Sequence, residues 1–213
     1  MKPLPGLEVA NLESVPSPSL LVWPGRVQSN IERMIELCGG PERLRPHVKT
    51  HKMDAVVRLQ LAAGIEKFKA STIAEVEMCL AAGARDVLLA YPVVGPGQDR
   101  LLRLALAYPH VRLAFLVDSA EVLSGMIAPC LAAGVELAAF VDFDCGMART
   151  GICSVDDAIS LVEAITAANG IHFAGVHAYD GHVRAPGVTD RRESWSGAME
   201  SVQALLDALA VAG

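Results

Sequence analysis

Short apolar runs alternate with amphipathic stretches along the chain. The amphipathic stretches repeat apolar residues at helical spacing, as in the stripe from Val27 to Cys38 and the stripe from Leu123 to Leu131. The apolar runs lack polar alternation, which is typical of strands that are covered on both faces. We expect such strands near Arg45–Lys49, Lys67–Ala70, Val87–Ala90, Leu113–Val117, Leu137–Val141 and Phe173–His177.

Three of the helical stretches end on the same sequence, Leu-Ala-Ala-Gly. Their glycines are Gly64, Gly83 and Gly134, and Gly213 closes a fourth stretch. A glycine just past a helix adopts the left-handed conformation without steric penalty, so each is predicted to end a helix.

Strands and helices that alternate in this way predict parallel βαβ units, which build either a doubly wound sheet or a (β/α)8 barrel. A complete barrel needs eight units and about 250 residues. The 213 residues hold about six units, so the pattern predicts an incomplete barrel of the (β/α)8 type. An open, doubly wound sheet is the alternative.

Composition excludes several classes of protein. A hydrophobic fraction of 52% allows a sizeable core and excludes a disordered chain. A net charge of −6 gives no reason to expect nucleic acid or an anionic membrane as a partner. Uncharged stretches fall short of the ~20 apolar residues of a membrane-spanning helix, and residues 1–15 lack an apolar signal segment. Five scattered cysteines favour reduced thiols in a cytoplasmic protein.

The most informative segment places basic side chains at the end of the first predicted strand. Residues 45–52 read Arg-Pro-His-Val-Lys-Thr-His-Lys, with Lys49 between His47 and His51. In parallel α/β folds the carboxyl edge of the sheet holds the active site. A lysine that projects inward there is partly desolvated, which lowers its pKa and frees the amine for Schiff-base formation. The alternative is a solvated basic turn, which the flanking histidines disfavour.

A second segment ends a later strand in a glycine-rich loop. Residues 141–151 read Val-Asp-Phe-Asp-Cys-Gly-Met-Ala-Arg-Thr-Gly and contain Asp142, Asp144 and Arg149. The two aspartates could form a carboxylate pair for a metal or for acid–base work. Alternate strand residues share one face, however, so we expect them to hold Arg149 or a neighbouring backbone.

A third segment again turns from an apolar strand to polar residues, with His177, Tyr179 and His182 within residues 175–182. The two histidines could relay protons near neutral pH. Equally, His177 could be a core histidine bonded to a backbone carbonyl, and His182 an ordinary loop residue.

Together the three segments resemble the pyridoxal-phosphate proteins related to D-threonine aldolase and eukaryotic-type D-serine dehydratase, which share the N-terminal barrel of the alanine racemase family. The octapeptide at residues 45–52 is the most specific part of this resemblance. It implies that Lys49 carries the cofactor as an internal aldimine and that Lys52 is a secondary basic residue. It places Arg149 near the phenolic oxygen of the cofactor and the substrate carboxylate, and Tyr179 near the pyridine ring. The implied cofactor-binding residues are Lys49, His47, Arg149, Tyr179 and His177.

The resemblance also implies a function. It is that of a lyase that cleaves 3-hydroxy D-amino acids into glycine and an aldehyde, as D-threonine aldolase does. A D-serine dehydratase, an amino-acid racemase, a non-catalytic cofactor carrier and an inactive fragment are the alternatives. The expected partners are a small D-amino acid and a second copy in a homodimer.

The family members are longer than this chain, and the resemblance runs from about Leu20 to its end. We therefore expect residues 1–213 to be one partial pyridoxal-phosphate-binding barrel, without the C-terminal β domain of the family. That domain supplies the ligands of the divalent metal (Mn, Zn or Mg) in the aldolases and dehydratases. No metal ligand is therefore predicted among these residues.

Overall fold

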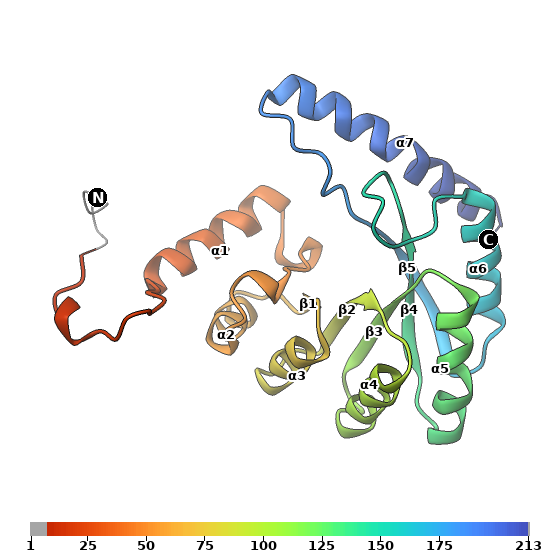
Figure 1. Ribbon diagram of the computed structural model, residues 1–213, viewed down its shortest axis with the longest axis horizontal. Helices are drawn as coiled ribbons and strands as arrows, with labels where there is room; N and C mark the ends of the chain where they lie inside the picture. Colours follow the sequence, from red (N-terminus) through yellow and green to blue (C-terminus); the bar gives the residue numbers. More distant parts are fainter. Residues whose placement is uncertain (1–7, 213) are drawn as a thin grey trace.

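In the computed structural model, five parallel strands alternate with helices (Figure 1). The structure describes residues 8–212, so the helix stop predicted at Gly213 lies outside the described residues. The strands are β1 (Lys67–Ala70), β2 (Asp86–Pro92), β3 (Arg112–Val117), β4 (Leu137–Phe143) and β5 (Ile171–Ala178). The helices are α1 (Pro24–Cys38), α2 (Asp54–Ala62), α3 (Ile73–Ala81), α4 (Pro96–Ala107), α5 (Ala120–Ala133), α6 (Val155–Ala167) and α7 (Val188–Ala212), with short 3₁₀ turns η1 (Leu12–Ser14), η2 (Pro41–Arg43) and η3 (Val48–Thr50).

The order of the strands decides between the two predicted architectures. Each strand pairs in parallel with the next one along the chain, in the order β1-β2-β3-β4-β5. A doubly wound sheet would reverse its order at a switch point, and this sheet does not. Although β1 and β5 lie at opposite ends of the sheet, Nζ of Lys69 lies 2.6 Å from Nε2 of His177. The sheet therefore curls into an arc, with its helices fanned around the outside (Figure 1). This is part of a barrel, as the sequence predicts.

The pleat of the strands separates two apolar layers. Side chains along a strand point alternately to the two faces, and the large buried ones, such as Phe68, Phe115 and Phe143, belong to the main core that includes the helices. A smaller cluster lines the other, inner face and consists of Leu88, Ala114, Leu116 and Ala138. Two of these four are alanines, which leave room on the concave inner face of the sheet.

The helices follow the predicted pattern. The two apolar stripes lie on α1 and α5, and Gly64, Gly83 and Gly134 take positive φ angles between 62° and 101° at helix ends. Helix α7 packs against α6, whereas residues 8–23, before α1, extend away from the barrel (Figure 1). Within residues 8–212, no helix combines the length and the apolar character needed to cross a membrane.

The strand predicted at Arg45–Lys49 is wrong. His47 makes only an isolated parallel bridge to Lys69, and η3 begins at the next residue. Pro46 has no N–H to give to a ladder, although its carbonyl accepts a hydrogen bond of 2.9 Å from the N–H of Lys69. The segment therefore lies beside β1, where a further strand would lie, but turns away after one residue pair. Residues 8–212 therefore form five strands rather than the six that the sequence predicts.

Candidate active site

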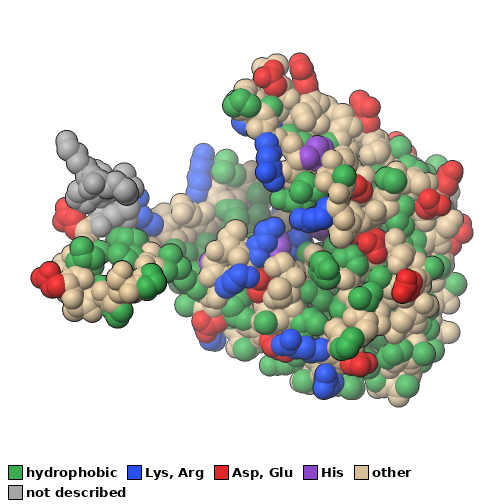
Figure 2. Space-filling model, in the orientation of Figure 1, with side chains coloured by type: hydrophobic (Ala, Val, Ile, Leu, Met, Phe, Trp, Pro, Cys, Tyr) green, Lys and Arg blue, Asp and Glu red, His purple; other side chains and the backbone are tan. Residues whose placement is uncertain are grey.

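The three predicted segments meet around one aromatic ring at the carboxyl edge of the sheet. Measured to the centroid of the Tyr179 ring, Cζ of Arg149 lies at 5.2 Å and Nζ of Lys49 at 5.5 Å. Nζ of Lys69 lies at 5.8 Å from the same point. The face of an aromatic ring attracts cations, and all three cationic groups lie within 6 Å of the centroid of this ring. In Figure 2, Lys and Arg side chains gather beside a His side chain near the middle of the face shown.

A chain of hydrogen bonds runs behind this ring. Lys69 contacts Nε2 of His177, and Nδ1 of His177 lies 2.7 Å from Oδ1 of Asp142. Oδ2 of Asp142 accepts a hydrogen bond of 2.8 Å from the hydroxyl of Thr150. The side chains of His177 and Asp142 are 10% and 6% exposed. They are also directly opposite each other in the pairing of β4 with β5, so the sheet itself sets their contact.

The loop that carries Arg149 is held by the second aspartate. Asp144 accepts hydrogen bonds from the backbone N–H groups of Gly146 and Ala148. Burial raises the pKa of Asp144, but these N–H groups outweigh it and hold the pKa below its usual value. At Gly151, where φ is +103°, a Cβ would lie 2.9 Å from the backbone nitrogen of Asp144, so the turn requires glycine. As predicted, one aspartate holds the neighbouring backbone, but neither makes a hydrogen bond that fixes Arg149.

Lys49 lies in η3, and its backbone is fixed by the residue two positions earlier. Nδ1 of His47 accepts a hydrogen bond of 3.3 Å from the N–H of Lys49. The Lys49 residue is exposed, yet its ammonium points toward the Tyr179 ring. Burial, together with the charges of Lys49 and Lys69, lowers the pKa of His47 to about 4. His47 is therefore neutral at pH 7, as an acceptor in this turn must be.

This shift predicts that the protein loses stability in mild acid. The ordinary pKa of histidine is 6.5, and His47 titrates near 4 in the folded protein. Between these two values the unfolded chain binds the additional proton, so the free energy of unfolding falls as the pH drops from 6.5 toward 4. In His47→Gln, urea unfolding midpoints at pH 7 and pH 4.5 are expected to differ less than in the wild type. His110→Gln, at an exposed position, is the control and keeps the wild-type difference. An unchanged difference in His47→Gln would refute the assignment.

The remaining basic residues of these segments have other contacts. Lys52 forms an ion pair with Glu75, which also accepts hydrogen bonds from the N–H and hydroxyl of Ser71. Nδ1 of His51 accepts from the N–H of Met53 and so holds the start of α2. His182 packs over Gly146, where an added Cβ would lie 2.9 Å from its Nε2.

Lys69 is the residue of this cluster that our sequence reasoning missed. Unlike the other predicted strands, Lys67-Phe68-Lys69-Ala70 does alternate polar and apolar residues, contrary to the pattern stated for these runs above. That alternation puts Lys69 on the face opposite Phe68, toward the barrel interior. It is the sequence signal that identifies Lys69.

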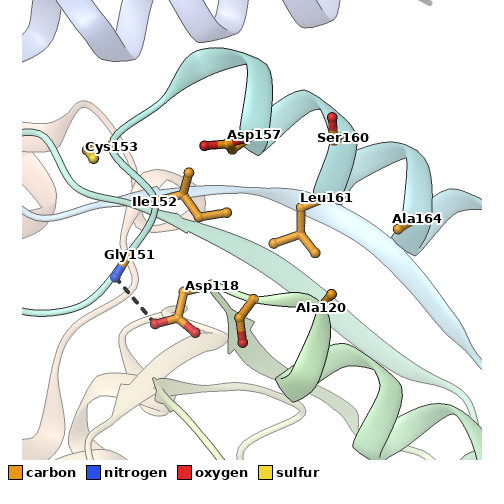
Figure 3. A pocket seen from close by; sticks show the side chains of 10 residues that line it. Asp118, Ala120, Gly151, Ile152, Cys153, Asp157, Ser160, Leu161 and Ala164 are labelled. Carbon is orange, nitrogen blue, oxygen red and sulfur yellow. Dashed lines mark hydrogen bonds between the residues drawn. The ribbon is translucent and has the colours of Figure 1, made fainter.

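A cavity of about 470 Å³ lies elsewhere at the same edge, between α5 and α6 (Figure 3). Ile152 and Leu161 line it, and Asp118 and Asp157 approach it from opposite sides (Figure 3). The N–H of Gly151 donates to Asp118 over 3.4 Å. No basic side chain is among the described residues that line this cavity, so it does not suit an anionic cofactor.

The fold and the cluster define a class of protein. It is a barrel-type α/β protein with a lysine amine, an arginine and an aromatic ring at the carboxyl edge of its sheet. In agreement with this class, residues 23–212 match the model of the alanine racemase N-terminal domain. The chain belongs to this family, whose members depend on pyridoxal phosphate.

Curated relatives include aldolases. The chain is 32% identical over 177 residues to a D-threonine aldolase from Arthrobacter sp., a match covering 81% of this chain and 45% of the relative. It is 28% identical over 214 residues to a 3-hydroxy-D-aspartate aldolase from Paracoccus denitrificans, covering 99% of this chain and 54% of the relative. The chain thus spans about half the length of these relatives.

Solved structures agree with this result. A D-threonine aldolase from Filomicrobium marinum superposes with a TM-score of 0.87 at 28% identity, over 95% of this chain and 55% of that one. A D-threo-3-hydroxyaspartate dehydratase from Delftia sp. HT23 gives 0.67 at 28% identity, over 91% and 53%. A mutant of that dehydratase was solved in a metal-free form, which implies that it binds a metal. Among residues 8–212 of this chain, no three His, Cys, Asp or Glu side chains are grouped to hold one.

Proposed function

We propose that this chain is the barrel part of a pyridoxal-phosphate-dependent lyase that cleaves 3-hydroxy D-amino acids into glycine and an aldehyde. The observation that carries this proposal is the position of Lys49 and Arg149, whose cationic groups both face the ring of Tyr179 at the carboxyl edge. The likeness to D-threonine aldolase and 3-hydroxy-D-aspartate aldolase supports the reaction and the substrate class.

The residues around Tyr179 fit the cofactor in chemistry and in charge. Lys49 offers a primary amine for the aldehyde group. Arg149 stays charged at all working pH values and can hold two oxygens at once, which suits the phenolic oxygen or the substrate carboxylate. The Tyr179 ring gives the pyridine ring an aromatic neighbour, and the three cations favour an anionic ligand.

The bound cofactor supplies an acceptor for the electrons released at Cα of an amino acid. The chain itself supplies orientation and proton control. Arg149 would orient the phenolic oxygen of the cofactor or the substrate carboxylate. The hydroxyl of Tyr179 carries no negative charge that would keep the pyridine nitrogen of the cofactor protonated. His177 has both ring nitrogens engaged, one by Lys69 and one by Asp142. We therefore assign it a holding role, in place of the proton relay that its sequence position suggested.

The proposal predicts both cofactor attachment and turnover. Purified protein incubated with pyridoxal phosphate and reduced with borohydride is expected to gain the mass of one phosphopyridoxyl group. Glycine release is then measured with D-threonine and 3-hydroxy-D-aspartate, with and without Mn²⁺, and with L-threonine as the control. Glycine from the D-substrates alone supports the lyase. A phosphopyridoxyl group without glycine release would show that this barrel part binds the cofactor but does not cleave the substrates by itself, and no such group would refute the proposal.

A further inference from the structure

Lys69 is set apart from the other cations of the site by its surroundings. It is half-buried on the inner face of β1, whereas Lys49 and Arg149 are exposed. Its ammonium is bonded to His177, a residue of the strand at the far end of the sheet. The charged or titratable groups near it are Lys49, His47, Arg45, Asp142, Arg149, His177 and Tyr179.

The donors and acceptors in the hydrogen bonds from Lys69 to Thr150 determine where the protons of these side chains lie. An ammonium group only donates hydrogen bonds, so Nε2 of His177 must accept from Lys69. A neutral imidazole has one N–H, which is then on Nδ1 and donates to Asp142 across 2.7 Å. The other carboxylate oxygen of Asp142 accepts from Thr150. With this proton placement, each polar side chain from Lys69 to Thr150 has a partner.

We propose that Lys69 is a positioning residue of the proposed site, which occupies Nε2 of His177 and so keeps the single imidazole proton on Nδ1, toward Asp142. Lys69 thereby ties β1 to β4 and β5 through one partly buried series of hydrogen bonds and presents its ammonium to the Tyr179 ring beside Lys49. The positioning role rests on the proposed function. The proton placement on His177 does not, because it is a property of the cofactor-free protein.

The charge of Lys69 supports this placement. Burial lowers the pKa of Lys69, and so does the charge of Lys49, whereas the carboxylate of Asp142 raises it. A second proton on His177 would put an imidazolium 2.6 Å from an ammonium in a half-buried position. While Lys69 is protonated, its ammonium therefore occupies the place that a proton on Nε2 would take.

The test is ¹⁵N nuclear magnetic resonance of the imidazole nitrogens in cofactor-free protein at pH 7. In the wild type, Nε2 of His177 is expected to show the shift of a hydrogen-bonded, unprotonated nitrogen, while Nδ1 carries the proton. In Lys69→Met, the Asp142 carboxylate remains and the ammonium is gone. Nε2 of His177 then loses its hydrogen-bond donor, so its shift is expected to differ from the wild-type value at the same pH.

Lys69→Arg is the matched variant, because a guanidinium also only donates hydrogen bonds, and it is expected to restore the wild-type Nε2 shift. Circular dichroism and the thermal midpoint establish that each variant is folded. If Lys69→Met does not fold, the wild-type spectrum alone decides, with exposed His110 as the internal reference. A protonated Nε2 in the wild type at pH 7, or the same Nε2 shift in wild type and Lys69→Met, overturns the proposal. Because no cofactor is present, neither result bears on attachment at Lys49.

Discussion

Lys49→Ala is expected to abolish the pyridoxyl label that borohydride fixes on the wild-type protein. The reason is geometric, since the ammonium of Lys49 faces the Tyr179 ring and lies in the same cluster as Arg149. Lys69 is also close to this ring, but its nitrogen is bonded to His177. The measurement is peptide mass mapping after reduction, with the labelled fraction falling at least about 100-fold.

Lys52→Ala is the matched control for this experiment. It removes a lysine from the same octapeptide, but one whose nitrogen is paired with Glu75. This variant should keep the label at Lys49 at the wild-type level. A label that persists in Lys49→Ala and maps to Lys69 would show that the more buried lysine holds the cofactor.

The sequence was sufficient for the elements whose signals are local. Runs such as Leu137–Val141 contain the apolar residues of a strand that is covered on both faces, and the structure places β4 there. Glycines such as Gly134 end helices because of a conformational preference that operates within one turn. These signals do not depend on the rest of the fold, so they can be recognised in a single sequence.

The interior of the barrel was harder to predict, because its contacts depend on how far the sheet curls. Lys69 and His177 are 108 positions apart and lie on strands at opposite ends of the sheet. Alternation predicts that Lys69 faces inward, but His177 shares that face only because the register of β5 shifts before Gly175. The curvature of the sheet then determines that the two side chains meet. The failed strand at Arg45–Lys49 has a different origin, because Pro46 is a local sequence signal against a strand.

The interior has two charged layers, one near each edge of the sheet. At the amino edge, Asp86 accepts hydrogen bonds from Arg45 at 2.5 and 3.2 Å and from Arg112 at 3.0 Å. At the carboxyl edge, Asp142 anchors the chain that ends at Lys69. Small apolar side chains such as Ala114 and Ala138 lie on the same face. Arg45 is part of the octapeptide, so the charged layer at the amino edge also holds the segment that leads to Lys49.

Asp142→Ala is expected to reduce the free energy of unfolding by about 3–5 kcal/mol. The carboxylate is nearly buried and accepts from both His177 and Thr150. Without it, the charge of Lys69 would remain partly buried with no carboxylate behind the imidazole. The measurement is urea unfolding at pH 7, with Asp156→Ala, on the exposed side of α6, as the control, which is expected to lose less than about 1 kcal/mol.

Asp142→Asn separates the charge of this residue from its hydrogen bonds. The amide oxygen can still accept from Nδ1 of His177, and the hydroxyl of Thr150 can rotate to accept from the amide nitrogen. The loss is therefore expected to be smaller than in Asp142→Ala, about 1–3 kcal/mol. If the free energy of unfolding falls equally in both variants, the negative charge of Asp142, rather than its hydrogen bonds, stabilises the link from Lys69 through His177 to Thr150. If neither loses more than Asp156→Ala, Asp142 does not anchor the site, and the link from β4 through His177 to Lys69 contributes nothing measurable to folding.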